Sequence, residues 1–135
     1  MFTKFDKAYI ETAVTWSKLS SAKRKQVGAI IVKDRCIIAE GYNGTCSGMD
    51  NRCEDENNVT LWHVLHAEAN ALTKVMRSGN TTVGATLYTT LSPCKECSKL
   101  IYQSGVKRVI YLDAYGDLTG VEFLKSLGVE CLKYE

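Results

Sequence analysis

Two short stretches organise the fold and the chemistry of this chain: residues 65–71, which read LHAEANA, and residues 92–97, which read SPCKEC. The first places a glutamate two positions after a histidine, and the second places a Cys-x-x-Cys pair directly after a proline. His66, Cys94 and Cys97 offer the nitrogen and sulfur ligands that zinc prefers, and three protein ligands with a fourth position left to water are typical of catalytic zinc sites. We therefore predict one catalytic zinc ion per chain, held by these three side chains.

The spacing of the histidine and the glutamate indicates where the metal lies. Residues two apart in a helix point about 200° away from each other, so His66 and Glu68 cannot both face a site against the side of one helix. They can face it if the metal sits at the helix entrance. Pro93 suits the corner before a second helix, whose positive end favours thiolates. We expect two helix N-termini to meet at one zinc, with Glu68 beside the metal as general acid and base.

Other interpretations of these residue types stay open at this stage. A Cys-x-x-Cys pair alone is also common in structural zinc sites and redox sites, and His63 would complete a closed set of four ligands. That interpretation leaves Glu68 and Pro93 without a role, and the joint spacing is far more specific than either half. Cys46 and Cys53, together with His63, are candidates for a second, structural zinc site.

Hydrophobic periodicity and turn residues predict helices and strands in alternation. The predicted elements are a helix over 4–19, a hairpin of strands 27–32 and 36–39, a helix from 65 to about 78, a strand over 86–90, a helix after Pro93 to 104, a strand over 108–112, a helix over 117–127 and a strand over 129–132. Gly79, Gly105 and Gly128 are expected to close the three later helices. This order predicts one α/β domain over residues 1–135, with a mixed five-stranded sheet and helices on both faces.

A long polar loop, from 41 to about 61, separates the hairpin from the histidine stretch. Such a length is unusual in a compact domain unless the loop has a function, and we expect it at the mouth of the site. In the first helix, apolar residues at three- and four-residue steps predict a stripe that faces the core: Phe5, Ala8, Tyr9, Ala13, Trp16 and Leu19. Cys36 and Cys131 fall within strands and are expected to be buried as small apolar side chains.

Composition excludes several classes of protein. The chain has 135 residues, 45% of them hydrophobic and 24% charged, which is typical of a globular protein. The sequence contains neither an apolar run long enough for a membrane span nor the apolar block of a signal peptide, so we expect a cytoplasmic protein without a membrane partner. The net charge of +2 comes with one dense basic cluster, residues 21–25. Such a cluster suffices for a phosphate or two, but not for a nucleic-acid groove.

Four segments together resemble the deoxycytidylate (dCMP) deaminase family, within the cytidine deaminase superfamily. They are 24–29 (RKQVGA), 41–48 (GYNGTCSG), 66–71 (HAEANA) and 90–97 (TLSPCKEC), and the resemblance runs from about Ser20 to the end of the chain. The last two segments suit several deaminase subfamilies, whereas the Gly-Tyr-Asn-Gly segment and the Ser-Pro-Cys form favour the dCMP branch. The resemblance implies a three-layer α/β/α cytidine-deaminase-like fold and the hydrolysis of dCMP to dUMP and ammonia in pyrimidine deoxynucleotide metabolism.

The resemblance also implies roles for individual residues. Glu68 would protonate N3 of cytosine, Asn43 would contact the sugar, Ala67 would contact the substrate and Tyr115 would form a wall of the pocket. Arg24 would bind the phosphate, which a guanidinium suits. A solvated turn is the alternative interpretation of the basic cluster around Arg24.

Relatives in this family are commonly hexamers that are activated by magnesium-bound dCTP and inhibited by dTTP. The resemblance therefore implies a homo-oligomer, with a hexamer favoured, and a regulator site that includes Gly41, Tyr42, Asn43 and Gly44. It also implies Mg²⁺ as a companion of the triphosphate regulator. The chain lacks the insertion that longer relatives carry before the catalytic histidine.

Two other functions compete with deamination of a free nucleotide. A deaminase acting on a base in RNA or single-stranded DNA needs a basic track and stacking side chains around the flipped base, and the modest net charge argues against such a track. A zinc-stabilised binding domain without catalysis is the second alternative, and the intact Glu68 argues against it. We therefore expect no nucleic-acid partner.

Overall fold

The elements follow one another in the predicted order in the computed structural model, which describes residues 1–135. They are α1 (Lys4–Ser17), β1 (Gly28–Lys33), β2 (Cys36–Tyr42), α2 (Ala67–Arg77), β3 (Thr86–Leu91), α3 (Lys95–Gln103), β4 (Arg108–Asp113), α4 (Thr119–Ser126) and β5 (Glu130–Lys133). The predicted bounds are wrong by one to three residues at most ends, most visibly at β2, which ends at Tyr42 and not at residue 39.

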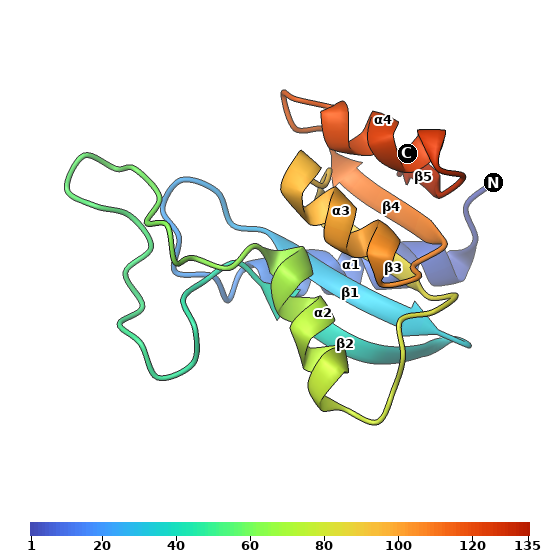
Figure 1. The fold of residues 1–135 in the computed structure, drawn as a ribbon, viewed down its shortest axis with the longest axis horizontal. Coiled ribbons are helices and arrows are strands. Elements are labelled where there is room, and N and C mark those ends of the chain that lie inside the picture. Colours follow the sequence, from blue (N-terminus) through green and yellow to red (C-terminus); the bar gives the residue numbers. More distant parts are fainter.

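The strands form one mixed sheet in the order β2-β1-β3-β4-β5. β1 runs antiparallel to both β2 and β3, whereas β3, β4 and β5 are parallel. α1 covers one face, and α2, α3 and α4 cover the other (Figure 1). The prediction of a mixed five-stranded sheet with helices on both faces, in three α/β/α layers, is confirmed.

The hairpin of β1 and β2 is longer than predicted. Asp34 and Arg35 both adopt positive φ, of 51° and 63°, as a two-residue hairpin turn requires. β2 then pairs as far as Tyr42, opposite Gly28, so the prediction that the loop starts at Gly41 is wrong. Gly41 belongs in the strand because α2 packs directly on it: a Cβ added there would lie 2.6 Å from the backbone oxygen of Ala67.

The predicted burial of the two strand cysteines is half right. Cys131 is buried in the core between the sheet and α2, α3 and α4. Cys36 is exposed, because it begins β2 directly after the turn at the sheet edge.

The predicted apolar stripe of α1 is half right: Ala13 lies in the core, and Tyr9 and Trp16 pack against it. Phe5, Ala8 and Leu19 are exposed. The fully buried residues of the helix are Ile10 and Ala13, with the polar residues Asp6 and Ser17 on either side of them. An aspartate was not expected in this position, and its burial has a specific cause in the strands below it.

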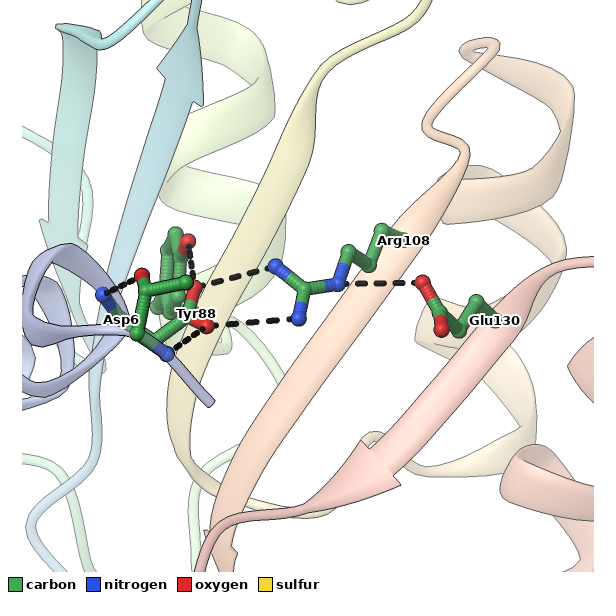
Figure 2. A network of polar contacts seen from close by, with 5 residues as sticks. Asp6, Tyr88, Arg108 and Glu130 are labelled. Carbon is green, nitrogen blue, oxygen red and sulfur yellow. Dashed lines mark hydrogen bonds and ion pairs between the residues drawn. The ribbon is translucent and has the colours of Figure 1, made fainter. Parts of the chain in front are cut away.

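A guanidinium from β4 compensates Asp6 (Figure 2). Arg108 donates to both carboxylate oxygens of Asp6, at 3.0 and 3.4 Å, and its Nε lies 3.1 Å from a carboxylate oxygen of Glu130. The hydroxyl of Tyr88 donates to Asp6 at 2.7 Å, and the N–H of Thr3 donates at 2.9 Å. Burial by itself would raise the pKa of Asp6, but the hydrogen bonds from Arg108, Thr3 and Tyr88 together lower it below its ordinary value.

Two of the three glycines expected to close helices have that role. Gly105 and Gly128 follow α3 and α4 with φ of 86° and 87°, in the left-handed region where glycine has no steric cost. Gly79 is not in that region, so the prediction for α2 is wrong. α2 ends at Arg77 and is capped by Ser78, whose backbone is extended and whose hydroxyl and N–H both donate to the carbonyl of Val75.

The long segment between β2 and α2 projects from the body of the chain (Figure 1, green) and contains a small hairpin of its own. Glu54 pairs with Thr60 in an antiparallel bridge, and the N–H of Leu61 donates to the carbonyl of Cys53. At the tip, the carboxylate of Asp55 accepts from the backbone N–H of residues 57 and 59. We call residues 53–61 the loop hairpin.

None of the helices is sufficiently long and apolar to cross a bilayer.

Candidate active site

The starts of α2 and α3 bring three potential metal ligands together. His66 is the N-cap of α2, Cys94 is the N-cap of α3, and Cys97 lies in the first turn of α3. The Nδ1 atom of His66 lies 3.5 Å from Sγ of Cys94 and 3.3 Å from Sγ of Cys97. The predicted meeting of two helix N-termini at one point is therefore present in the fold.

These separations fit a tetrahedral metal. With zinc–nitrogen and zinc–sulfur bonds of about 2.0 and 2.3 Å, nitrogen and sulfur ligands of one zinc ion lie about 3.5 Å apart. The three ligand atoms all lie within 4.8 Å of one another. The backbone N–H of Cys97 also points to Sγ of Cys94, at 3.4 Å. The donor set of this chain thus fits zinc in both chemistry and spacing.

The local charges already favour a thiolate. A hydrogen bond from the Cys97 thiol, a second from His66 and the N–H of Cys97 lower the pKa of Cys94 to about 3. The neighbouring Cys94 sulfur and burial raise the pKa of Cys97, because a second negative charge beside the first is disfavoured. The hydrogen bond to Cys94 raises the pKa of His66. A divalent cation would remove the conflict between the two sulfurs.

Glu68 lies in the first turn of α2, and only 4% of its surface is exposed. It lines the same cavity as His66 and Cys94 but does not belong to the group of converging metal ligands. Burial raises the pKa of Glu68 to about 7, despite the opposing effects of a backbone hydrogen bond and His66. A carboxyl group with such a pKa can both take up and release a proton near neutral pH.

A cavity of about 420 Å³ opens above this group. Four residues that the sequence analysis assigned to the substrate line it: Arg24, Asn43, Ala67 and Tyr115. Three of the four residues assigned to the regulator do not: Gly41, Tyr42 and Gly44. The predicted substrate residues are thus brought to one cavity, which also includes Asn43 from the predicted regulator set, and the other three predicted regulator residues lie outside its wall.

Asn43 has a structural task that the sequence did not indicate. Its side-chain oxygen accepts from the N–H of Val27 at 2.8 Å, and its amide nitrogen donates to the carbonyl of Lys25 at 2.7 Å. One amide thus joins the residue after β2 to the basic segment, residues 21–25, which borders the cavity. One amide hydrogen of Asn43 is left for a further partner.

The regulator candidates next to Asn43 are engaged with the body of the fold. Tyr42 packs against Trp16 with ring centroids 6.3 Å apart, and its carbonyl accepts from Asn70. Gly44 forms an isolated bridge with Leu65. These contacts give residues 42 and 44 a structural role, because they hold the start of α2 in place.

Ser92 and Glu54 are among the residues of the cavity wall that sequence reasoning missed. Ser92 is buried beside the Cys-x-x-Cys turn, and its hydroxyl accepts from the N–H of Tyr115 at 2.6 Å, which holds the loop after β4 against the site. Glu54 reaches the wall from the loop hairpin. Nothing in the sequence indicates that Glu54, a polar residue in a polar loop, is buried. For Ser92, the Ser-Pro-Cys pattern was the one signal that could have indicated a place in the site.

A second zinc site is not supported. No other group of three histidine, cysteine or acidic side chains converges in the fold. Sγ of Cys53 lies 3.5 Å from the carbonyl of Asn51, while Cys46 is exposed. The ring of His63 packs edge-on against Trp62 and does not join the three-ligand group, so the closed four-ligand alternative also fails.

A histidine and two cysteines at two helix N-termini, beside a buried glutamate on an α/β/α scaffold, define the zinc-dependent nucleobase deaminases. Residues 3–113 match the family described as the cytidine and deoxycytidylate deaminase zinc-binding region. The chain belongs to this family, and within it to the enzymes of the deoxycytidylate deaminase branch.

Individual relatives show the extent of the likeness. The deoxycytidylate deaminase of Mycobacterium phage D29 is 36% identical over 121 residues, 79% of this chain and 93% of that protein. ComE operon protein 2 of Bacillus subtilis is 40% identical over 100 residues, and the chain spans about half of it, 52%. The structure of the dCMP deaminase of cyanophage S-TIM5 in complex with dCMP and dUMP superposes with a TM-score of 0.96 at 46% identity, covering 99% of both chains.

Proposed function

We propose that this chain catalyses the zinc-dependent hydrolysis of dCMP to dUMP and ammonia. The observation that carries the proposal is the convergence of His66, Cys94 and Cys97 at a cavity shared with the buried Glu68. The likeness to a phage dCMP deaminase along nearly the whole chain supports the choice of substrate. A free nucleotide as substrate also agrees with the predicted cytoplasmic location.

His66, Cys94 and Cys97 would hold the zinc ion. Zinc held in this way lowers the pKa of a water molecule and makes it a nucleophile near neutral pH. Glu68 would accept a proton from the attacking water as the water oxygen bonds to C4 of cytosine, and it would pass that proton to N3. The proton that remains on this oxygen would then move through Glu68 to the amino group, so that the C4–N bond breaks and ammonia leaves. The burial that raises the pKa of Glu68 to about 7 suits it to both steps.

The rest of the cavity suits a nucleotide whose base reaches Glu68. Ala67 and Tyr115 would border the base, and the amide hydrogen of Asn43 that has no partner within the chain is available to donate to the sugar. Arg24 binds the phosphate, because it combines a guanidinium with a place on the cavity wall. The present hydrogen bond of the guanidinium, to the hydroxyl of Thr60 at 3.4 Å, is long and weak, so a phosphate oxygen can replace this hydroxyl.

We further propose regulation of a hexamer by magnesium-bound dCTP as activator and dTTP as inhibitor, through Gly41, Tyr42, Asn43 and Gly44. Asn43 offers the physical link, because its amide holds the backbone of residues 25 and 27 next to Arg24. A regulator that displaces residues 41–44 would therefore shift the phosphate-binding segment. Turnover of dCMP measured with dCTP and Mg²⁺, with dTTP, and with neither tests this proposal, and equal rates would refute it.

An ammonia-release assay tests the activity itself. Zinc-loaded protein is given dCMP, CMP, deoxycytidine, dCTP and a cytosine-containing oligonucleotide, and dCMP should be turned over with the highest kcat/KM. Turnover of the oligonucleotide with no turnover of dCMP would assign the chain to nucleic-acid deamination instead.

A Glu68→Gln variant tests the mechanism. The amide keeps the shape of the side chain but cannot carry protons, so the variant should retain about one zinc per chain and lose at least about 100-fold in kcat. Full activity in this variant would exclude Glu68 as the proton carrier.

A further inference from the structure

Glu54 is a nearly buried carboxylate that the proposed mechanism leaves without a role. Only 5% of its surface is exposed, although it comes from the polar loop hairpin. Its Oε2 atom accepts from the backbone N–H of Lys23 at 2.9 Å and of Arg24 at 3.2 Å. This side chain therefore ties the loop hairpin to the basic segment, and it lines the active-site cavity.

The second carboxylate oxygen of Glu54 has no partner within the chain. Glu54 forms no ion pair, even though Arg24 and Lys25 line the same cavity. Ser98 Oγ is the one fully enclosed side-chain oxygen or nitrogen that lacks a partner, so Oε1 of Glu54 is not enclosed by protein. An acceptor with free lone pairs thus borders the cavity.

A carboxylate beside a phosphate-binding segment needs a particular kind of partner. Glu54 would repel a phosphate, whereas Arg24 and Lys25 would attract it. The 5′-phosphate of the nucleotide must therefore lie at the two basic residues, and the 3′ side of the sugar is left for Glu54. The hydroxyl of a deoxyribose is a donor, which a carboxylate accepts strongly. Asn43 cannot take this place as readily, because its oxygen already accepts from Val27.

We propose that Glu54 accepts a hydrogen bond from the 3′-hydroxyl of the nucleotide and so restricts the substrates to mononucleotides with a free 3′ end. This inference rests on the proposed deamination of dCMP. A 3′-phosphate or 3′-phosphodiester would bring negative charge against Glu54 and remove the donor at the same time. The same residue would therefore exclude internal cytosines of nucleic acids, for a reason independent of the net charge of the chain.

A cycle of two enzymes and two substrates tests the contact. Wild type and Glu54→Gln are compared on dCMP and on 2′,3′-dideoxycytidine 5′-monophosphate, which lacks only the hydroxyl. In the glutamine variant the amide oxygen can still accept from Lys23 and Arg24, while the amide nitrogen replaces the free acceptor. Wild type should lose roughly 10- to 100-fold in kcat/KM on the dideoxy substrate, as expected for a hydrogen bond to a charged group.

The variant should discriminate much less between dCMP and the dideoxy substrate, because its neutral amide nitrogen can only donate to the 3′-hydroxyl oxygen and forms a weaker hydrogen bond than the carboxylate accepts. Deoxycytidine 3′,5′-bisphosphate should be a poor substrate of wild type and a better one of the variant. Glu56→Gln is the matched control, because Glu56 is exposed on the same hairpin and should behave as wild type. Binding of dUMP and of 2′,3′-dideoxyuridine 5′-monophosphate, followed by calorimetry, gives the same comparison without turnover.

Equal kcat/KM of wild type on dCMP and on the dideoxy substrate would overturn the proposal, and this result needs no variant to fold. Full discrimination between the two substrates by a zinc-loaded Glu54→Gln would overturn it as well. Absence of ammonia release from dCMP by zinc-loaded wild type would instead refute the proposed function, so the two failures can be told apart.

Discussion

Gly120, in the first turn of α4, packs directly against the turn that carries the metal ligand Cys94. Its replacement by alanine should therefore displace this turn. A Cβ added at Gly120 would lie 2.5 Å from the backbone oxygen of Pro93 and 2.8 Å from the backbone carbon of Cys94. It would also lie 2.5 Å from the hydroxyl oxygen of Ser98. Since two of these three neighbours are backbone atoms, no side-chain rotation relieves the contact. The gap between α4 and this turn must open by roughly 1 Å to reach ordinary van der Waals separation.

Two effects set the size of the change. Forcing an extra methyl group into a packed contact costs about 1–3 kcal/mol, while alanine is favoured over glycine in a helix by up to about 1 kcal/mol. We expect a net destabilisation of about 1–2 kcal/mol for Gly120→Ala. Because the shift falls on the turn that carries Cys94, zinc affinity should also decrease, by about the 10- to 100-fold that loss of supporting contacts typically costs.

Competition for zinc against a chromophoric chelator measures the affinity, and urea denaturation of the zinc-loaded protein measures the stability. Gly79→Ala is the matched control, since a Cβ at Gly79 meets nothing within 4 Å. A Gly120→Ala protein that binds zinc as tightly as the Gly79→Ala protein would show that α4 does not position Cys94.

Three further predictions concern the scaffold. Asp6→Asn should lower the free energy of unfolding at pH 7 by about 1.5–3 kcal/mol, because it removes hydrogen bonds to a charged group. Folding lowers the pKa of Asp6, so the contribution of this carboxylate to the free energy of unfolding is complete above its unfolded pKa of about 3.9 and disappears as the pH falls through the folded value. The difference in the free energy of unfolding between wild type and Asp6→Asn, measured by urea denaturation, should therefore shrink below about pH 4. A difference that stays constant with pH would contradict this account. Ser98→Ala should leave stability unchanged or raise it by about 1 kcal/mol, since it removes a buried hydroxyl oxygen without a partner, and a clear loss in thermal denaturation would mean that the hydroxyl is bonded. Gly41→Ala should destabilise the protein by at least about 1–3 kcal/mol without any nucleotide present, because its Cβ would lie 2.6 Å from the backbone oxygen of Ala67, and wild-type denaturation would show that α2 can yield.

The metal-ligand geometry was predictable because it depends on local rules. The two-residue spacing of His66 and Glu68 excludes the side of a helix, and Pro93 marks the start of the next helix, so the meeting of two N-termini follows from helix geometry alone. The order of elements and the two-sided sheet follow from periodicity in the same way.

The buried polar residues were not predictable, because their partners are remote in the sequence. Asp6 is buried through Tyr88 and Arg108, which lie 82 and 102 positions away, and helix periodicity treats an aspartate as a solvent-facing residue. Glu54 is buried because its loop folds back on residues 23 and 24. In both cases the compensating group decides the burial, and no local pattern announces it.

The cluster around Arg108 also bears on the order in which the chain folds during synthesis. α1 is synthesised before the other elements of this fold, yet the apolar residues it covers come from three strands: Ile30, Tyr88 and Ile110. Its buried carboxylate has no cationic partner until Arg108 has been made. α1 is therefore among the last elements to gain its native contacts, and until Arg108 has left the ribosome this amphipathic segment must stay in solution or be shielded by other means.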